Sequence, residues 1–130
     1  MTKRRIGHAN LGDARILLVE DEPMLAYALE ESLVEAGFQI AGVAGRVGQA
    51  LKIVERGDCD AAIIDVNLAG VSSGPVASAL AALAIPFIVV SGYSREQKQD
   101  AFAGARFIQK PCRLDDLVKA LQDLFPESLL

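Results

Sequence analysis

The stretch DAAIIDVNLAG, residues 60–70, places four apolar residues between two aspartates and then turns into a loop that reaches a glycine. An apolar run this short and rich in isoleucine is typical of a central parallel strand covered on both faces. Asp65 would then lie at the carboxyl end of the strand, the edge where open α/β sheets hold their ligands. Because an acid after a strand is also a common turn former or helix cap, its role depends on the rest of the chain.

The length and composition of the chain indicate one folded domain. The chain has 130 residues, of which 52% are hydrophobic, yet no apolar run approaches the roughly 20 residues that cross a bilayer, and no signal-peptide pattern opens the sequence. We therefore expect a cytoplasmic protein without membrane insertion. The expected organisation is a mobile tail over 1–13, one domain over 14–125 and a short tail over 126–130.

Charge and cysteine usage exclude two classes of function. The formal net charge of -4 argues against nucleic-acid binding, which needs a clustered basic surface. Cys59 and Cys112 lie far apart, with no CxxC or histidine-rich spacing beside them. Free thiols in a reducing compartment are therefore expected in place of a disulfide or a zinc site.

Short apolar runs alternate along the domain with segments that have the apolar spacing of helices. The expected strands span 15–20, 38–44, 60–65, 86–91 and 105–109, and the expected helices span 23–35, 47–57, 75–84, 95–102 and 114–125. Regular alternation with short loops predicts an α/β fold with a doubly wound parallel sheet, because right-handed crossovers place helices on both faces. We expect the flavodoxin-like fold of five strands in the order 2-1-3-4-5 with five helices.

Two further acids follow the first expected strand. Under this strand order, Glu20 and Asp21 lie beside Asp65, because strands one and three are neighbours. Three carboxylates repel one another unless a cation neutralises them, and hard oxygen ligands suit Mg²⁺. The same residues also fit a solvated acidic turn at the start of a helix.

A hydroxyl group and a lysine end the remaining two strands. Ser91 ends the fourth expected strand, and Lys110 and Pro111 follow the fifth. An acceptor carboxylate, a divalent cation and donors for phosphoryl oxygens are the parts that phosphoryl transfer needs. Ser91 could instead form a turn before Gly92, and Lys110 could be an ordinary surface charge. Their joint placement at one edge of the sheet favours the phosphoryl-transfer interpretation.

With these residues the chain resembles the response-regulator receiver domains of bacterial two-component signalling, over about residues 14–125. The family pattern is an acidic pair after the first strand, an aspartate after the third, Thr or Ser after the fourth and Lys-Pro after the fifth. The matching residues here are Glu20, Asp21, Asp65, Ser91, Lys110 and Pro111.

The resemblance implies a role for each residue of the pattern. Asp65 would be the phosphoacceptor, with Ser91 and Lys110 holding the phosphoryl oxygens. The implied cofactor is Mg²⁺, and its implied ligands are Asp21 and Asp65 directly, Glu20 directly or through water, and the backbone carbonyl of Asn67. A cis peptide bond between Lys110 and Pro111 is also implied.

Three features depart from the common pattern of the family. The loop after Asp65 lacks the proline that many receivers carry, which leaves it less constrained before Ser72. Gly92 and Tyr93 after Ser91 are similar to a group of single-domain alpha-proteobacterial receivers with a Phe-Ala-Thr-Gly-Tyr-like motif. Phe107 stands where many receivers have a tyrosine.

These departures lead to expectations about switching and signal lifetime. Ser91 and Phe107 would form the conformational switch. Asn67 and Tyr93 are placed to control the access of water to the aspartyl phosphate and thus its lifetime. Tyr93 could instead be an aromatic residue that binds a partner.

The expected function is to accept a phosphoryl group on Asp65, with Mg²⁺, from a sensor histidine kinase or a histidine phosphotransfer protein. The chain would later hydrolyse the phosphate, so it would be primarily a signalling switch that catalyses its own modification. With little chain after 125, we expect signalling through contacts with a downstream protein, or a role as phosphorelay intermediate or phosphate sink.

Two alternatives stay open. One is a protein-interaction module of the same fold that signals without phosphorylation, which intact Asp65, Ser91 and Lys110 disfavour. The other is a small doubly wound enzyme, which the absence of a Gly-rich phosphate loop disfavours.

Overall fold

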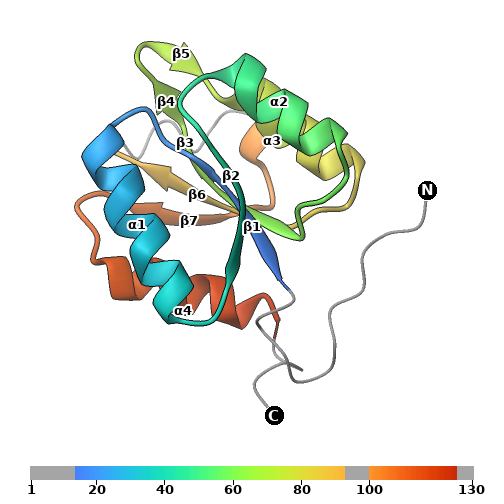
Figure 1. Cartoon of the computed structure of the whole chain (residues 1–130). Helices are drawn as coiled ribbons and strands as arrows, with labels where there is room; N and C mark the ends of the chain where they lie inside the picture. The colour runs from blue at the N-terminus through green and yellow to red at the C-terminus, as the bar shows by residue number, and fades with distance from the viewer. Residues whose placement is uncertain (1–13, 93–99, 126–130) are drawn as a thin grey trace.

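The computed structural model describes residues 14–92 and 100–125 and shows a layered α/β arrangement (Figure 1). The expected tails, the expected helix at 95–102 up to residue 99, and Tyr93 lie outside these ranges. Within them, no helix is long and apolar enough to span a membrane.

Five parallel strands form the central sheet, in the order β2-β1-β3-β6-β7. Numbered by their place among these five strands along the chain, this is the predicted order 2-1-3-4-5, which is confirmed. The strands are β1 (Arg15–Val19), β2 (Gln39–Ala44), β3 (Ala61–Asp65), β6 (Phe87–Ser91) and β7 (Arg106–Gln109). The central strand β3 is buried at every position, as its uninterrupted apolar sequence predicts.

Helices cover both faces of the sheet, as right-handed crossovers require. One face carries α1 (Pro23–Glu35) and α4 (Leu114–Asp123), and the other carries α2 (Val47–Glu55) and α3 (Gly74–Ala82) (Figure 1). Each pair of helices encloses a separate apolar core against the sheet.

The prediction of five helices is wrong for the described part of the chain, which has four α-helices. Residues 100–102 form only a 3₁₀ turn, η3 (Asp100–Phe102), and Gly104 follows at φ +82°. Gly104 has the left-handed conformation that ends a helical turn, so the described residues here do not continue as an α-helix. Helix α3 is covered on one face only, although its sequence is almost uniformly small and apolar: Val76, Ala77 and Leu80 are buried, and its other side is exposed.

Helix α1 begins with a proline at its first position, where the missing N–H is not needed. Leu29 and Leu33 are buried against the sheet, whereas Leu25, one turn nearer the carboxyl edge, is only partly covered. Gly37 follows the helix at φ +100°, a conformation in which a side chain would be strained.

A small antiparallel hairpin follows Asp65 and was not predicted. Its strands are β4 (Asn67–Leu68) and β5 (Val71–Ser72), joined by Ala69 and Gly70 at φ 53° and 88°. The N–H of Gly70 donates to Oδ1 of Asn67 (2.6 Å). This hydrogen bond and the strand pairing give the loop a defined shape without the proline that many receivers carry.

Candidate functional site

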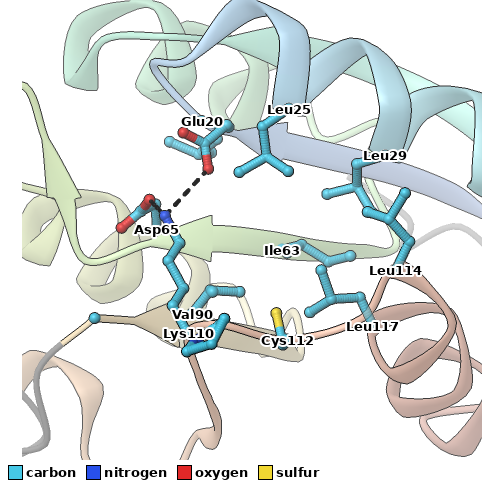
Figure 2. Close-up of a pocket in the computed structure, with 13 residues that line it drawn as sticks. Glu20, Leu25, Leu29, Ile63, Asp65, Val90, Lys110, Cys112, Leu114 and Leu117 are labelled. Atoms are coloured by element: carbon cyan, nitrogen blue, oxygen red, sulfur yellow. Dashed lines mark hydrogen bonds and ion pairs between the residues drawn. The ribbon is translucent and has the colours of Figure 1, made fainter.

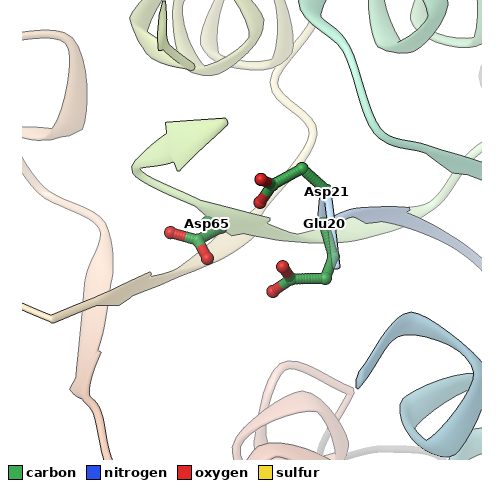
Figure 3. A group of neighbouring side chains, drawn as sticks. All are labelled: Glu20, Asp21 and Asp65. Carbon is green, nitrogen blue, oxygen red and sulfur yellow. The ribbon is translucent and has the colours of Figure 1, made fainter. Parts of the chain in front are cut away.

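Three carboxylates meet at the carboxyl edge of the sheet (Figure 3). Glu20 and Asp21 follow β1, Asp65 ends β3, and oxygen atoms of all three lie within 4.8 Å of one another. Glu20 and Asp65 are buried, whereas Asp21 is exposed. Because β1 and β3 are paired in parallel, their carboxyl ends lie side by side and form the acidic cluster that the sequence predicted.

A single ammonium group compensates part of this charge. Nζ of Lys110 lies 2.5 Å from Oδ2 of Asp65 and 3.8 Å from Oε1 of Glu20 (Figure 2). The backbone N–H of Lys110 donates to the carbonyl of Ser91 (2.8 Å), which ties the end of β7 to the end of β6. The Lys110–Pro111 peptide bond is cis, as the resemblance implied.

Burial and charge shift the proton affinities of the two groups nearest Asp65. Burial raises the pKa of Glu20 to about 7, with a smaller opposing effect from the N–H of Glu22 and a further upward effect from the charge of Asp65. Burial alone would lower the pKa of Lys110. The hydrogen bond and ion pair with Asp65, together with the negative charge of Glu20, outweigh this effect and raise the pKa. Lys110 is therefore cationic, and a further cation close to Glu20 would favour the charged form of that carboxyl group.

The two oxygens of Asp65 have different partners. Oδ2 accepts from Lys110, while Oδ1 accepts from the backbone N–H of Asn67 at 3.2 Å. Only 7% of Asp65 is exposed, so its carboxylate is fixed in direction and largely removed from bulk water.

Ser91 and Phe107 lie on β6 and β7, the two strands that follow β3 in the order of the sheet. Ser91 is fully buried at the end of β6, and it is not among the described residues that line the recess above Asp65. Phe107 on β7 is partly buried, and its ring packs edge-on against Phe102 with centroids 6.2 Å apart.

The recess itself is open and polar. It has a volume of about 600 Å³. Its lining includes Glu20, Asp21, Asp65, Asn67 and Lys110. An all-oxygen donor set of this kind, with room for water, fits Mg²⁺. The three carboxylates, with Asn67 beside them, would hold the ion there.

Sequence reasoning missed a second cavity, which opens from the same carboxylates between α1 and α4. Figure 2 shows side chains from both helices facing one another across it. Leu25, Leu29 and Leu33 have the spacing of one helix face, but nothing in the sequence indicates that Leu25 lines an open space. Tyr93 lies outside the described residues, so its role stays a prediction.

The chain belongs to the response regulator receiver domain family, whose model matches residues 16–122. The resemblance seen in the sequence is therefore confirmed at the level of the family. The fold, the order of the strands and the acidic cluster agree with this assignment.

Similarity to individual proteins supports the assignment to this family. The chain is 33% identical over 113 residues to the transcriptional regulatory protein PdtaR of Mycobacterium tuberculosis, covering 83% of this chain but 55% of that protein. It thus spans about half the length of this relative. The solution structure of SdrG from Sphingomonas melonis Fr1 is 43% identical, with a TM-score of 0.73 and coverage of 87% and 97% of the two chains.

A further relative is the response regulator protein TrrA from Thermotoga maritima, solved in complex with Mg(2+)-BeF. It is 29% identical, with a TM-score of 0.75 and coverage of 85% of this chain and 98% of that chain.

Proposed function

We propose that this chain accepts a phosphoryl group on Asp65 from a phosphohistidine of a sensor kinase or phosphotransfer protein. The observation that carries the proposal is the pairing of Asp65 with Lys110 in a recess that also presents Glu20 and Asp21. A carboxylate fixed in direction beside one cation and two further acids has the parts of a phosphoacceptor site.

Each residue then has a defined task. A carboxylate oxygen of Asp65 forms the new bond to phosphorus as the bond from phosphorus to the donor nitrogen breaks, and the imidazole keeps the electron pair. Lys110 holds a phosphoryl oxygen through its ammonium group, which Asp65 and Glu20 keep protonated. Mg²⁺, when bound, neutralises charge that accumulates on the phosphoryl oxygens. Glu20, Asp21 and Asp65, with the carbonyl of Asn67, hold that ion.

The same site would convert phosphorylation into a change of surface. The buried Ser91 hydroxyl shifts toward the phosphoryl group, which leaves space that the Phe107 ring can enter. Movement of Phe107 alters the surface formed by β7 and α4, where a downstream protein would bind. A role as relay intermediate or phosphate sink requires only the first transfer.

The decisive experiment is incubation with acetyl phosphate and Mg²⁺, followed by intact mass measurement. The wild type should gain one phosphoryl group, and Asp65→Asn should gain none, because an amide is a poor nucleophile. Asp115→Asn, a change at an exposed acid on α4, is the matched control and should behave as wild type. Full incorporation into Asp65→Asn would overturn the assignment, and no incorporation into either protein would favour signalling without phosphorylation.

A further inference from the structure

The cavity between α1 and α4 has a volume of about 460 Å³. Ligand-binding cavities commonly measure roughly 300–1,000 Å³, so this space can hold a small molecule. Its apolar wall comes from both helices, from the sheet beneath them and from the segment before α4 (Figure 2). The side chains that form this wall are Leu25, Leu29, Ile63, Val90, Cys112, Leu114 and Leu117.

One end of the cavity is charged. Glu20, Asp65 and Lys110 line it there, and Asp21 lies within 4.8 Å of the other two acids. Two carboxylates and one ammonium group line this end, with the third carboxylate close by, so its formal charge is negative. Oε2 of Glu20 accepts from the N–H of Glu22 at 3.0 Å, whereas Oε1 lies 3.8 Å from Nζ of Lys110, beyond hydrogen-bond length.

We propose that this cavity binds a small molecule with one cationic head and an unbranched apolar tail. The ammonium or amidinium head would pair with Oε1 of Glu20, and the tail would lie between α1 and α4 against Leu25, Leu29 and Leu117. This site is separate from the proposed phosphoryl recess in its apolar part and shares Glu20, Asp65, Gly92 and Lys110 with it.

Charge complementarity decides between possible head groups. An anionic head group would be repelled, because carboxylates outnumber ammonium groups at this end of the cavity. A neutral head group would give the buried Glu20 no further charged partner. A cation at this point also occupies the acids that are proposed to hold Mg²⁺. Binding of the small molecule and binding of Mg²⁺ should therefore exclude each other.

The apolar part of the cavity sets the dependence on tail length. Burial of each methylene group contributes about 0.8 kcal/mol, which corresponds to about fourfold in affinity. Affinity should rise by this factor with each added carbon until the tail reaches the far end of the cavity, and then stop rising.

The experiment uses n-octylammonium as the probe and the whole chain without phosphodonor, so its outcome does not depend on the proposed phosphorylation. Binding is followed by the methyl NMR signals of the leucines that line the cavity. Butylammonium has the same head with a short tail, and octanoate has the opposite charge on a tail that is one carbon shorter. We expect saturable binding of n-octylammonium, much weaker binding of both comparison compounds, and at least tenfold weakening by excess Mg²⁺.

Cys112→Phe fills the cavity with a ring and should weaken binding at least tenfold. Leu83→Phe introduces the same ring at an exposed position outside the cavity and should leave binding unchanged. Thermal unfolding of both variants checks that they fold. If Cys112→Phe does not fold, a second experiment on the wild type takes its place. It measures whether n-octylammonium protects the Cys112 thiol from N-ethylmaleimide, with the buried Cys59 as the internal reference.

Equal binding of octanoate and n-octylammonium would overturn the proposal, because charge would then have no part in recognition. Absence of any saturable n-octylammonium binding, or no loss of binding in folded Cys112→Phe and no protection of Cys112, would overturn it as well.

Discussion

Nζ of Lys110 lies 2.5 Å from Oδ2 of Asp65, although 45 residues separate them in the chain. Strand β6 lies between β3 and β7, and the bond from the N–H of Lys110 to the carbonyl of Ser91 extends the sheet by one residue. The side chain of Lys110 can therefore extend past the end of β6 and reach Asp65. The contact is a product of strand order, which is why it can form without any local sequence signal.

The first prediction concerns the ammonium group of this pair. Lys110→Met keeps the length and apolar part of the side chain but removes its charge. Phosphoryl incorporation from acetyl phosphate should slow by about 10²–10³, the range observed when one donor to a developing oxyanion is removed. Lys119→Met, at an exposed position on α4, is the control and should have no effect. Equal rates in both variants would exclude a role of Lys110 in transfer.

The second prediction concerns Phe107, whose ring is partly buried against Phe102. Amide NMR shifts of β7 and α4 should differ between the protein with and without acetyl phosphate and Mg²⁺, and Phe107→Ala should remove most of this difference. In Phe107→Tyr the difference should shrink, because an inward ring would have to bury an unpaired hydroxyl. Phe125→Ala, which removes a ring packed on Phe38 instead, should preserve it. An undiminished difference in Phe107→Ala would show that the ring is not the switch.

The third prediction tests a close approach that holds α2 against the sheet. A Cβ at Gly42 would lie 2.5 Å from Cδ1 of Ile53, closer than real contacts allow. Overpacking in Gly42→Ala should lower the free energy of unfolding by about 1–3 kcal/mol. The alanine also makes the unfolded chain less flexible, which should offset about 0.4–1 kcal/mol of that loss.

Ile53→Val removes the clashing Cδ1 atom and provides the matched test by urea unfolding. Alone it should cost about 0.5–1.5 kcal/mol, but in the Gly42→Ala background it should restore stability. The same cost in both backgrounds would mean that the clash is relieved elsewhere.

The fourth prediction concerns stability at high pH. Burial, followed by the charges of Asp60 and Asp58, raises the pKa of Cys59 from 9.0 to about 11. Below pH 9 the thiol is protonated in both folded and unfolded chains, so it has no effect on the pH dependence. Between pH 9 and 11 the unfolded thiol ionises while the folded thiol does not, so the free energy of unfolding should fall, in total by about 2 kcal/mol.

Comparison with Cys59→Val isolates this contribution, because other groups that titrate in the range are common to both proteins. The wild type should lose more stability between pH 9 and 11 than the variant does. Parallel pH profiles would show that the folded thiol ionises as readily as the unfolded one.

The sequence was sufficient for the sheet order and the acidic cluster because both depend on the positions of whole strands. Glu20, Asp21, Asp65 and Lys110 each follow an apolar run, and the order of the runs brings them together. The hairpin after Asp65 could not be predicted in the same way. Its turn holds Ala69 at φ 53°, whereas asparagine and glycine are the residues that usually mark such a turn.

The cavity between α1 and α4 was unpredictable for a different reason. Apolar spacing indicates which side of a helix faces inward, and Leu25 and Leu117 lie on such sides of α1 and α4. It does not show how completely facing side chains fill the space between them, which depends on helix separation and rotamers.

The last prediction concerns the lifetime of the phosphate and rests on Asn67. Its side chain is exposed, lines the recess and accepts the N–H of Gly70, so it is held at the edge of the hairpin. Hydrolysis needs a water molecule aligned with the scissile bond, and bulk at this edge should obstruct that approach. Asn67→Met should lengthen the half-life of the phosphorylated protein about tenfold if the obstruction adds about 1.4 kcal/mol to the barrier.

Asn67→Ala separates obstruction from loosening of the hairpin, because it loses the same hydrogen bond to Gly70 without adding bulk. Its half-life should stay the same or shorten, as measured by intact mass after the phosphodonor is removed. Equal lengthening in both variants would assign the effect to the hairpin, since only the lost hydrogen bond is common to them. If Asn67→Met hydrolyses at the wild-type rate, the water must approach from another side of the recess, and Asn67 has no control over the lifetime.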